Sequence, residues 1–368
     1  MIRVMLDGLV KRYDRVSVVD GASLEIQPGE LLVVSGPSGA GKTTLARLIA
    51  GLEQPDQGEI FFDGRVMQDV PAAKRRVGVL FQDDALWPHL SVAENVAYGL
   101  RVQGIGRRER KHRVVEALDL ARIGSLGHRR PDQLSPLQRQ RAALARALVI
   151  EPELLILDEP LGMLETRVRT EFREEIRRIH SEAETTTLVF THAPREALAL
   201  ADRLAIMDLG RIVQTGAPFE LYNRPLDPFV AQFLGQANLL SGQVEGTDAR
   251  GESVVRTAIG RLIGQTPNGP LPDGTPVTVA IRPESLSLGP YVAPDSNRFI
   301  ATLERQVFLG ELRQMHLVGP ADHPILALAL QSHSDHLRDG QSLTVSVPPE
   351  LVVVLPNRFR NREAQRAE

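Results

Sequence analysis

The 368-residue sequence predicts an α/β domain followed by an all-β domain. In the first part, the apolar run at residues 154–157 lacks alternation, which favours a parallel strand covered on both faces. Farther along, helical periodicity fades, and short apolar strands are separated by turns rich in Gly, Pro and Asp. We therefore expect an α/β domain over residues 1–235, a small β-barrel over 236–357 and a charged, frayed tail over 358–368.

Local signals place the individual elements. Ser91 and Glu94 have the spacing of a capping box, which predicts a helix through Leu100. Pro194 predicts the start of another helix, because proline is favoured in the first turn. Strands are expected at residues 2–6, 16–26, 31–34, 58–64 (with a turn), 77–81, 154–157, 187–191, 203–208, 211–213, 277–281, 299–303, 315–318 and 343–347, and two short helices at 217–223 and 228–234.

Composition excludes several classes of function. The net charge of −3 gives no basic field for nucleic acid or anionic lipid. The absence of cysteine excludes disulfides, thiolate metal sites and cysteine nucleophiles. The N-terminus lacks the apolar core of a signal peptide, and the longest apolar runs are far below the ~18 residues that span a bilayer. We expect a soluble protein that can still dock on a membrane partner.

A glycine-rich turn between an apolar strand and a helix is the strongest functional signal. Its spacing, G-x-x-x-x-G-K-T, is that of a phosphate-binding loop in the context that such a loop requires. Glycines let backbone N–H groups face an anion, and the helix directs the positive end of its dipole there. The Lys would reach the β- and γ-phosphates of a nucleoside triphosphate, and the first Thr would bind Mg²⁺. The residues expected to bind the nucleotide here are Gly36, Ser38, Gly39, Ala40, Gly41, Lys42, Thr43 and Thr44.

Acidic and imidazole side chains end two other predicted strands. Asp158 and Glu159 close the run at 154–157, and His192 follows the run at 187–191. Open α/β sheets bind ligands at the carboxyl ends of their strands, so these side chains are expected beside the phosphates. One acid would serve the metal and the other would polarise water. Helix capping would account for either acid alone, but poorly for the whole set.

Tyr13 is a lone aromatic residue in a stretch, 11–14, that predicts a polar turn. Its residue type leaves two interpretations evenly balanced. It is either a surface tyrosine that packs on a strand end or a flat ring on which a purine stacks.

Taken together, the phosphate loop, Phe81-Gln82, Asp158-Glu159 and His192 resemble the ATP-binding subunits of ABC transporters. More narrowly, the chain resembles import ATPases with a C-terminal OB-type (TOBE-like) regulatory domain, and residues 281–284 match a tetrapeptide typical of that domain. The resemblance implies a P-loop NTPase domain with a helical subdomain at about 85–150, followed by an OB-like barrel. It also implies an ATPase that uses ATP and Mg²⁺.

The resemblance also implies roles for single residues. Tyr13 would stack on adenine, which favours the functional interpretation of this ring. Gln82 would contact Mg²⁺ and the attacking water and sense the membrane subunit. Asp158 would hold Mg²⁺ through water, and Glu159 would be the catalytic carboxylate. His192 would contact the γ-phosphate as a third catalytic group.

The sequence departs from the family at the signature motif, which is L-S-G-G-Q in its relatives and Leu-Ser-Pro-Leu-Gln here, at 134–138. In the family this segment completes the ATP site of the opposite subunit, so Ser135 and Gln138 are candidate ATP-binding residues. Pro136 has no N–H to offer, and Leu137 adds bulk where the backbone should approach closely. The spacing from Ser135 to Gln138 still predicts a capping box, with Pro136 at the first helical position. We expect normal binding of ATP and Mg²⁺ with slower closure and turnover.

Two further differences are Glu165, where an aspartate is typical, and Ala193, which is usually aspartate. The predicted partners are a second copy of the chain or another ATPase subunit, integral membrane permease subunits and, indirectly, a periplasmic or extracellular solute-binding protein, but no nucleic acid. The predicted location is the cytoplasmic face of the membrane. The segment 233–240 gives a weak preference for ferric iron or a polyamine as the transported solute. A nucleotide-gated regulator with little turnover is the main alternative, and a soluble ABC protein acting on nucleic acid or ribosomes is a weaker one.

Overall fold

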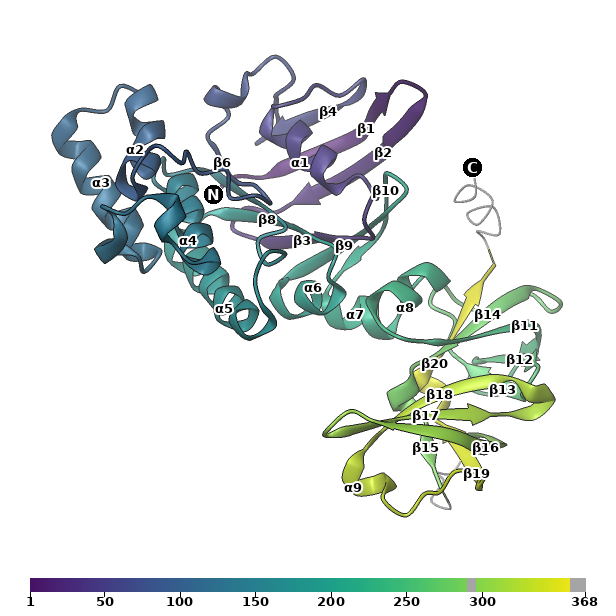
Figure 1. Ribbon diagram of the computed structural model, residues 1–368. Coiled ribbons are helices and arrows are strands. Elements are labelled where there is room, and N and C mark those ends of the chain that lie inside the picture. The colour runs from purple at the N-terminus through teal and green to yellow at the C-terminus, as the bar shows by residue number, and fades with distance from the viewer. Residues whose placement is uncertain (290–295, 358–368) are drawn as a thin grey trace. The chain divides into compact units, whose positions relative to one another are not determined.

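The computed structural model describes residues 1–289 and 296–357, and the chain divides into two compact units, Met1–Pro218 and Phe219–Glu368 (Figure 1). The charged tail expected at 358–368 lies outside the described residues. The boundary between the two units follows Pro218, earlier in the chain than the boundary predicted at residue 235. It groups α8 (Pro228–Leu234) and nearly all of α7 (Pro218–Asn223) with the second unit.

The central sheet of the first unit has the order β10-β9-β3-β8-β7-β6, with β10 antiparallel to its neighbour and the other pairs parallel. Strands β3, β7 and β8 are buried along their whole length, as unbroken apolar runs predict. The strand predicted at 77–81 lies at the edge and alternates between buried and half-buried residues. The bounds are β3 (Leu31–Ser35), β6 (Val77–Leu80), β7 (Leu154–Asp158), β8 (Thr186–Thr191), β9 (Arg203–Asp208) and β10 (Arg211–Gly216).

A second, antiparallel sheet has the order β2-β1-β4-β5. Its apolar side chains share one core with the helix α1 (Lys42–Ala50) and with β3, β7 and β8 of the central sheet. Its strands are β1 (Val4–Tyr13), β2 (Val16–Ile26), β4 (Gln57–Phe62) and β5 (Arg65–Val66).

The first strand is longer than predicted. The expected strand at 2–6 continues to Tyr13, which pairs with Val16, so the polar turn at 11–14 was wrong in extent. At the register shifts along β1, polar residues of this strand stay paired with β2. The turn itself contains Asp14, whose φ is 53°.

In the first unit, α2, α3 and α4 form a helical region that packs around a hydrophobic core of its own. The capping box at the start of α2 is confirmed, and so is the one at the start of α4, with Pro136 at its first position. The long helix α5 was not foreseen. The bounds are α2 (Val92–Val102), α3 (Arg107–Leu120), α4 (Pro136–Leu148), α5 (Thr166–Ala183) and α6 (Pro194–Leu200).

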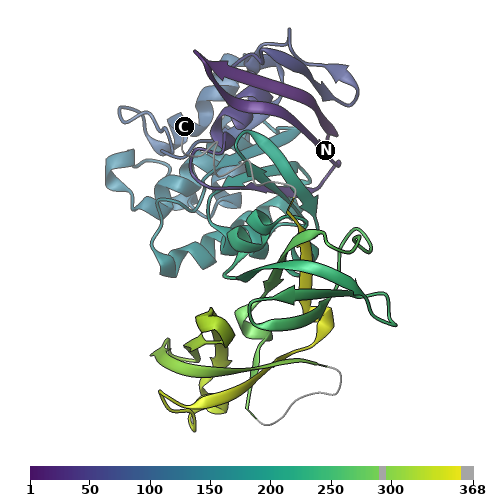
Figure 2. The same ribbon diagram turned by 90° about the vertical axis from the view of Figure 1, so that its right-hand side faces the viewer.

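The second unit contains two five-stranded antiparallel sheets that share one hydrophobic core (Figures 1 and 2). Their orders are β13-β12-β11-β14-β20 and β15-β19-β16-β17-β18, and a short helix α9 (Gln331–Ser334) follows β18. The prediction of an all-β domain is confirmed. The bounds are β11 (Asn238–Thr247), β12 (Ser253–Thr257), β13 (Gly260–Gly264), β14 (Pro276–Ile281), β15 (Ser287–Leu288), β16 (Asn297–Phe308), β17 (Leu312–Val318), β18 (Pro324–Leu330), β19 (Ser342–Val347) and β20 (Val352–Pro356).

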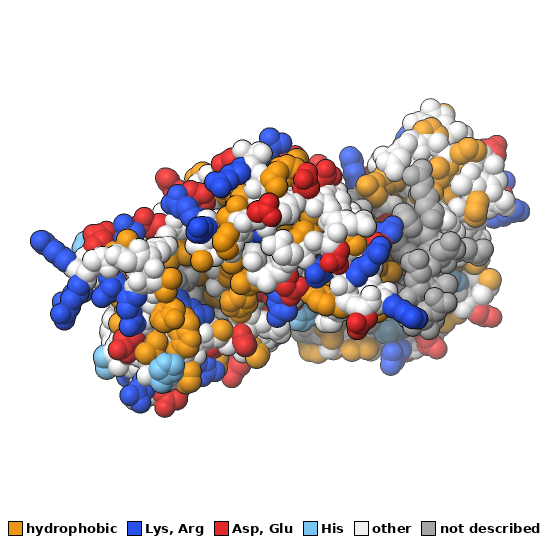
Figure 3. All heavy atoms as spheres, turned by 90° about the horizontal axis from the view of Figure 1, so that it is seen from above, with side chains coloured by type: hydrophobic (Ala, Val, Ile, Leu, Met, Phe, Trp, Pro, Cys, Tyr) orange, Lys and Arg blue, Asp and Glu red, His pale blue; other side chains and the backbone are white. Residues whose placement is uncertain are grey.

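Two properties of the surface and helices bear on function. Acidic and basic side chains are intermixed over the face drawn in Figure 3, so neither sign of charge dominates that face. Among the described residues, no helix has the length and apolar character needed to cross a bilayer.

Candidate nucleotide-binding site

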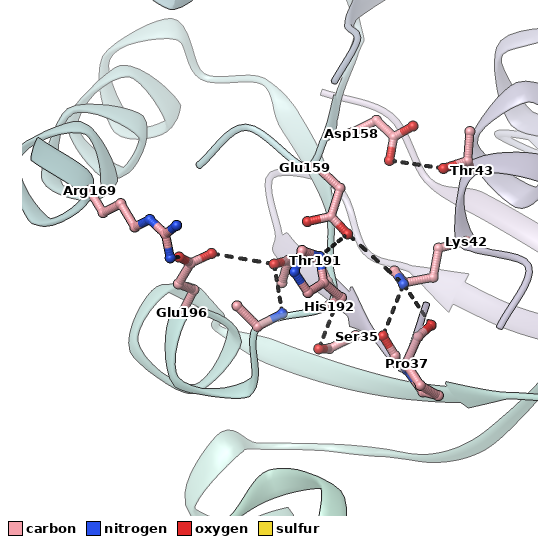
Figure 4. A network of polar contacts seen from close by, with 12 residues as sticks. Ser35, Pro37, Lys42, Thr43, Asp158, Glu159, Arg169, Thr191, His192 and Glu196 are labelled. Atoms are coloured by element: carbon pink, nitrogen blue, oxygen red, sulfur yellow. Dashed lines mark hydrogen bonds and ion pairs between the residues drawn. The ribbon is translucent and has the colours of Figure 1, made fainter. Parts of the chain in front are cut away.

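The topology brings the predicted functional residues to one edge of the central sheet. Ser35 at the end of β3 pairs with Thr191 at the end of β8, and Asp158 at the end of β7 pairs with Phe190. The phosphate loop therefore leaves the same sheet edge at which Asp158, Glu159 and His192 lie (Figure 4). This is where open α/β sheets bind ligands.

Three glycines shape the phosphate loop for different reasons. A Cβ on Gly36 would lie 2.1 Å from the carbonyl oxygen of Met207, so the loop needs glycine to leave the sheet here. Gly41 has a φ of 98° and a similarly close neighbour in the Val18 carbonyl. Gly39 also has a positive φ of 82°, but the space beside it is open. Its backbone can therefore approach a ligand closely.

The start of α1 is suited to an anion. The helix has no side-chain cap and no acidic residue in its first turn, so its first N–H groups are available to a phosphate. The buried Lys42 ammonium donates to the carbonyls of Gly36 and Pro37 at 2.9 and 3.0 Å and lies 3.9 Å from a Glu159 carboxylate oxygen. Burial lowers the pKa of Lys42, and the two acids nearby oppose that shift.

Asp158 and Thr43 are brought together as a possible metal site. The Thr43 hydroxyl donates to Asp158 Oδ1 at 3.4 Å, and the Asp158 side chain is buried. Burial raises the pKa of this carboxyl, while the Thr43 hydrogen bond lowers it. A hydroxyl and a carboxylate oxygen are ligands that Mg²⁺ prefers, so these two groups fit that ion.

Three contacts fix Glu159, and Figure 4 draws those of its carboxylate. Its backbone N–H donates to the carbonyl of Phe190 at 2.9 Å, and its φ of 50° turns the chain away from the strand. Its carboxylate lies 2.9 Å from His192 Nδ1 as well as 3.9 Å from the Lys42 ammonium. Non-glycine residues in this backbone region concentrate at functional sites, where the surrounding structure maintains them.

Two predicted residues lie at the periphery of this cluster. Gln82 is exposed and comes two residues after Leu80, which pairs with Leu157 of β7, so it follows the same sheet edge. Tyr13 is 42% exposed at the end of β1, and its hydroxyl donates to a carboxylate oxygen of Glu53. That hydrogen bond is the main reason why the pKa of Tyr13 is raised.

Ser135 and Gln138 are not joined to the phosphate loop by any hydrogen bond or ion pair of the described residues. Gln138 N–H donates to the Ser135 hydroxyl at 3.3 Å, and Ser135 N–H donates to Gln138 Oε1 at 3.0 Å. Both side chains therefore cap α4. Of the remaining predicted residues, Ser38 and Ala40 lie in the turn before α1, and Thr44 lies in the first turn of that helix.

The residues that hold the segment around His192 were not predicted from the sequence. The Thr191 hydroxyl accepts from the N–H of Ala193 at 3.1 Å and donates to Glu196 at 3.4 Å. Glu196 in turn lies 3.4 Å from Arg169 of α5. The available signal was the position of Thr191 next to His192, together with Glu196 one helical turn later.

Comparison with known proteins identifies the family. A model described as ABC transporter matches residues 19–162, and a TOBE domain model matches residues 279–355. The spermidine/putrescine import ATP-binding protein PotA of Rubrobacter xylanophilus is 40% identical over 348 residues, which cover 94% of this chain and 91% of that protein. The chain belongs to the ATP-binding subunits of ABC import systems. It is an ATPase subunit with a C-terminal TOBE domain, as the sequence predicted.

Other relatives and structures agree with this assignment. The sulfate/thiosulfate import ATP-binding protein CysA of Gloeobacter violaceus is 39% identical, covering 94% of each chain. The Fe(3+) ions import ATP-binding protein FbpC of Brucella abortus is 40% identical, covering 84% of this chain and 85% of that protein. The ATP-binding cassette MJ0796, described as a dimer bound to ADP and Pi, matches with a TM-score of 0.54 and 28% identity, covering 58% of this chain and 98% of that one.

Proposed function

We propose that the chain hydrolyses ATP at the carboxyl edge of its central sheet, as one of two such subunits that drive membrane permeases to import a solute. The observation that carries this proposal is the convergence of Lys42, Thr43, Asp158, Glu159 and His192 on one edge. Phosphoryl transfer depends mainly on positioning and on neutralising charge, and this cluster has the groups for both.

In this proposal each group has a separate task. The N–H groups of the phosphate loop and the Lys42 ammonium hold the β- and γ-phosphates, which displace Lys42 from its present partners. Glu159 polarises the attacking water. His192, which contacts the Glu159 carboxylate, also contacts the γ-phosphate. Gln82 reaches the same edge from the end of β6. Tyr13 offers an exposed ring for adenine.

Mg²⁺ is the proposed metal. Thr43, Asp158 and Gln82 would hold it, and when bound it would neutralise charge on the β- and γ-phosphate oxygens. The Thr43–Asp158 contact at 3.4 Å supports this set, because both groups already face one another. Ser135 and Gln138 are proposed to meet the ATP of the opposite subunit, as a dimer would require.

The proposed assembly has two copies of this chain, or this chain with a second ATPase subunit, on the cytoplasmic face of the membrane. It would act with permease subunits and a periplasmic or extracellular solute-binding protein. Ferric iron or a polyamine is the proposed cargo. Relatives named for spermidine/putrescine, Fe(3+) and sulfate/thiosulfate are nearly equally similar, so uptake of each solute has to be compared directly.

The test separates binding from turnover. Calorimetry should show uptake of Mg·ATP by the wild type and by Glu159→Gln, but not by Lys42→Ala. Glu159→Gln should lower the ATPase rate of the complex with its permease by about 10² to 10⁴, the usual contribution of a general base. Lys111→Ala, which changes an exposed lysine of α3, is the matched control and should bind and turn over normally. Absence of Mg·ATP uptake by the folded wild type would overturn the proposal.

A further inference from the structure

The segment that follows Gln82 is held in an unusual backbone conformation. Asp84 and Ala85 have φ values of 53° and 47°, and neither is glycine. Two successive residues in this region persist only where neighbouring groups hold them. The holding groups therefore matter for the position of Gln82, two residues before Asp84.

Those groups come from α4 and α2. The Arg146 guanidinium donates to the carbonyl of Asp84 at 2.7 Å and to that of Ala85 at 2.5 Å. It also lies over the ring of Trp87, 5.2 Å from its centroid. Asn95 of α2 fixes the backbone of Trp87, because its side chain accepts from the Trp87 N–H at 2.8 Å and donates to the Trp87 carbonyl at 3.1 Å.

A second arginine of α4 links this segment to the signature motif. Arg139 Nε lies 3.2 Å from Asp84 Oδ2, and its Nη1 donates to the carbonyl of Leu134 at 3.2 Å. Leu134 is buried and directly precedes Ser135. One guanidinium therefore joins the carboxylate of Asp84 to the carbonyl of Leu134, directly before the N-cap residue of α4.

We propose that Asp84 is a positioning residue for the signature segment, acting through Arg139 on the orientation of Ser135. The inference rests on the proposed function, in which Ser135 meets the ATP of the opposite subunit. The Asp84 side chain is only 21% exposed and that of Arg139 36%, so solvent screens their contact less than it screens an exposed pair.

The experiment measures ATP hydrolysis by the complex with its permease as separate kcat and KM values. Asp84→Asn and Arg139→Gln should each lower kcat about fivefold with KM for ATP unchanged, a size that contacting groups commonly show. The double variant should be no worse than either single one, because both remove the same contact. Asp84→Glu keeps the charge and should recover most of the rate, whereas Arg139→Lys keeps the charge but lacks the guanidinium fork that contacts both partners, so it should recover less. Asp83→Asn, at the neighbouring exposed acid, should behave as the wild type.

Ser135→Ala separates the two proposals. If it leaves kcat unchanged, the role proposed for Ser135 fails and this inference fails with it. If Ser135→Ala lowers kcat but Asp84→Asn and Arg139→Gln do not, or if their effects add in the double variant, only the inference is overturned. A fall in thermal stability without a fall in kcat would also overturn it, because it would show a merely structural contact. If Asp84→Asn does not fold, the kcat of Asp84→Glu relative to Arg139→Gln decides in the same way.

Discussion

Tyr13 gives a direct test at the scale of one residue. Its ring is exposed while its hydroxyl is fixed by Glu53, so the ring is oriented before any base arrives. We expect Tyr13→Ala to raise KM for ATP about tenfold, because stacking of a base on an aromatic ring contributes about 1–3 kcal/mol. Titration of ATP in a hydrolysis assay measures this change.

Tyr13→Phe is the matched control for this residue. It keeps the ring and removes only the hydroxyl contact with Glu53. We expect its KM to stay close to that of the wild type. If Tyr13→Ala bound ATP as tightly as Tyr13→Phe, adenine would not stack on this ring.

The residues of the site differ in how far the sequence could predict them. Lys42, Asp158 and His192 each follow an apolar strand, and parallel strands collect their carboxyl ends at one edge. Their proximity was therefore predictable before any distance was known. Glu196 and Arg169 were not, because the contact between them joins two helices whose packing leaves no local pattern.

At the scale of an element, the signature segment is better suited to capping a helix than to the ATP contact proposed for it. Ser135 caps α4 and Pro136 occupies the first helical position, so the helix starts correctly. Pro136 offers no N–H to a phosphate, and Leu137 adds a branched side chain. We expect Pro136→Gly combined with Leu137→Gly to raise the ATPase rate of the complex about tenfold, because one preorganised backbone donor is worth about 10² or more in rate elsewhere.

The same double variant should lose stability. Replacing proline at a compatible position by glycine costs about 1 kcal/mol through the entropy of the unfolded chain. Urea unfolding measures this loss. Ser135→Ala provides a control, because it removes the side-chain cap of α4 while keeping Pro136 and Leu137. An unchanged ATPase rate in the double variant would contradict the idea that this signature slows turnover.

Elements with a local signal were predictable and the others were not. The capping box at Ser91 fixed the start of α2. The long helix α5 lacks such a signal, since its N-cap residue Glu165 makes no side-chain cap. The first strand was predicted too short. Its register shifts place polar residues within the ladder and so interrupt the alternation of apolar and polar residues that predicts a strand.

At the scale of the whole molecule, Arg282 ties α7 and α8 to the second unit. This buried guanidinium donates to the carbonyls of Tyr222, Ala231, Gly235 and Gln236, and it lies 3.9 Å from the centroid of the Tyr222 ring. It thereby fastens α7, α8 and the segment after them to β14. Composition and periodicity predicted the boundary without this contact, because neither reveals to which carbonyls a distant arginine donates.

Loss of this arginine should loosen the second unit alone. Arg282→Met keeps much of the apolar stem but removes the guanidinium hydrogen bonds to the carbonyls of α7, of α8 and of the segment after α8. Each hydrogen bond to a charged group contributes about 1.5–3 kcal/mol. We expect the unfolding free energy of the second unit to fall by about 3 kcal/mol or more, with the amide hydrogens of α7 and α8 exchanging faster than in the wild type.

The control variant, Arg261→Met, removes only an exposed ion pair with Glu245, so it should change the unfolding free energy by less than about 1 kcal/mol. Binding of Mg·ATP by calorimetry should be unchanged in both variants, because the phosphate loop lies in the other unit. Equal stability of the two variants would show that Arg282 does not hold these helices.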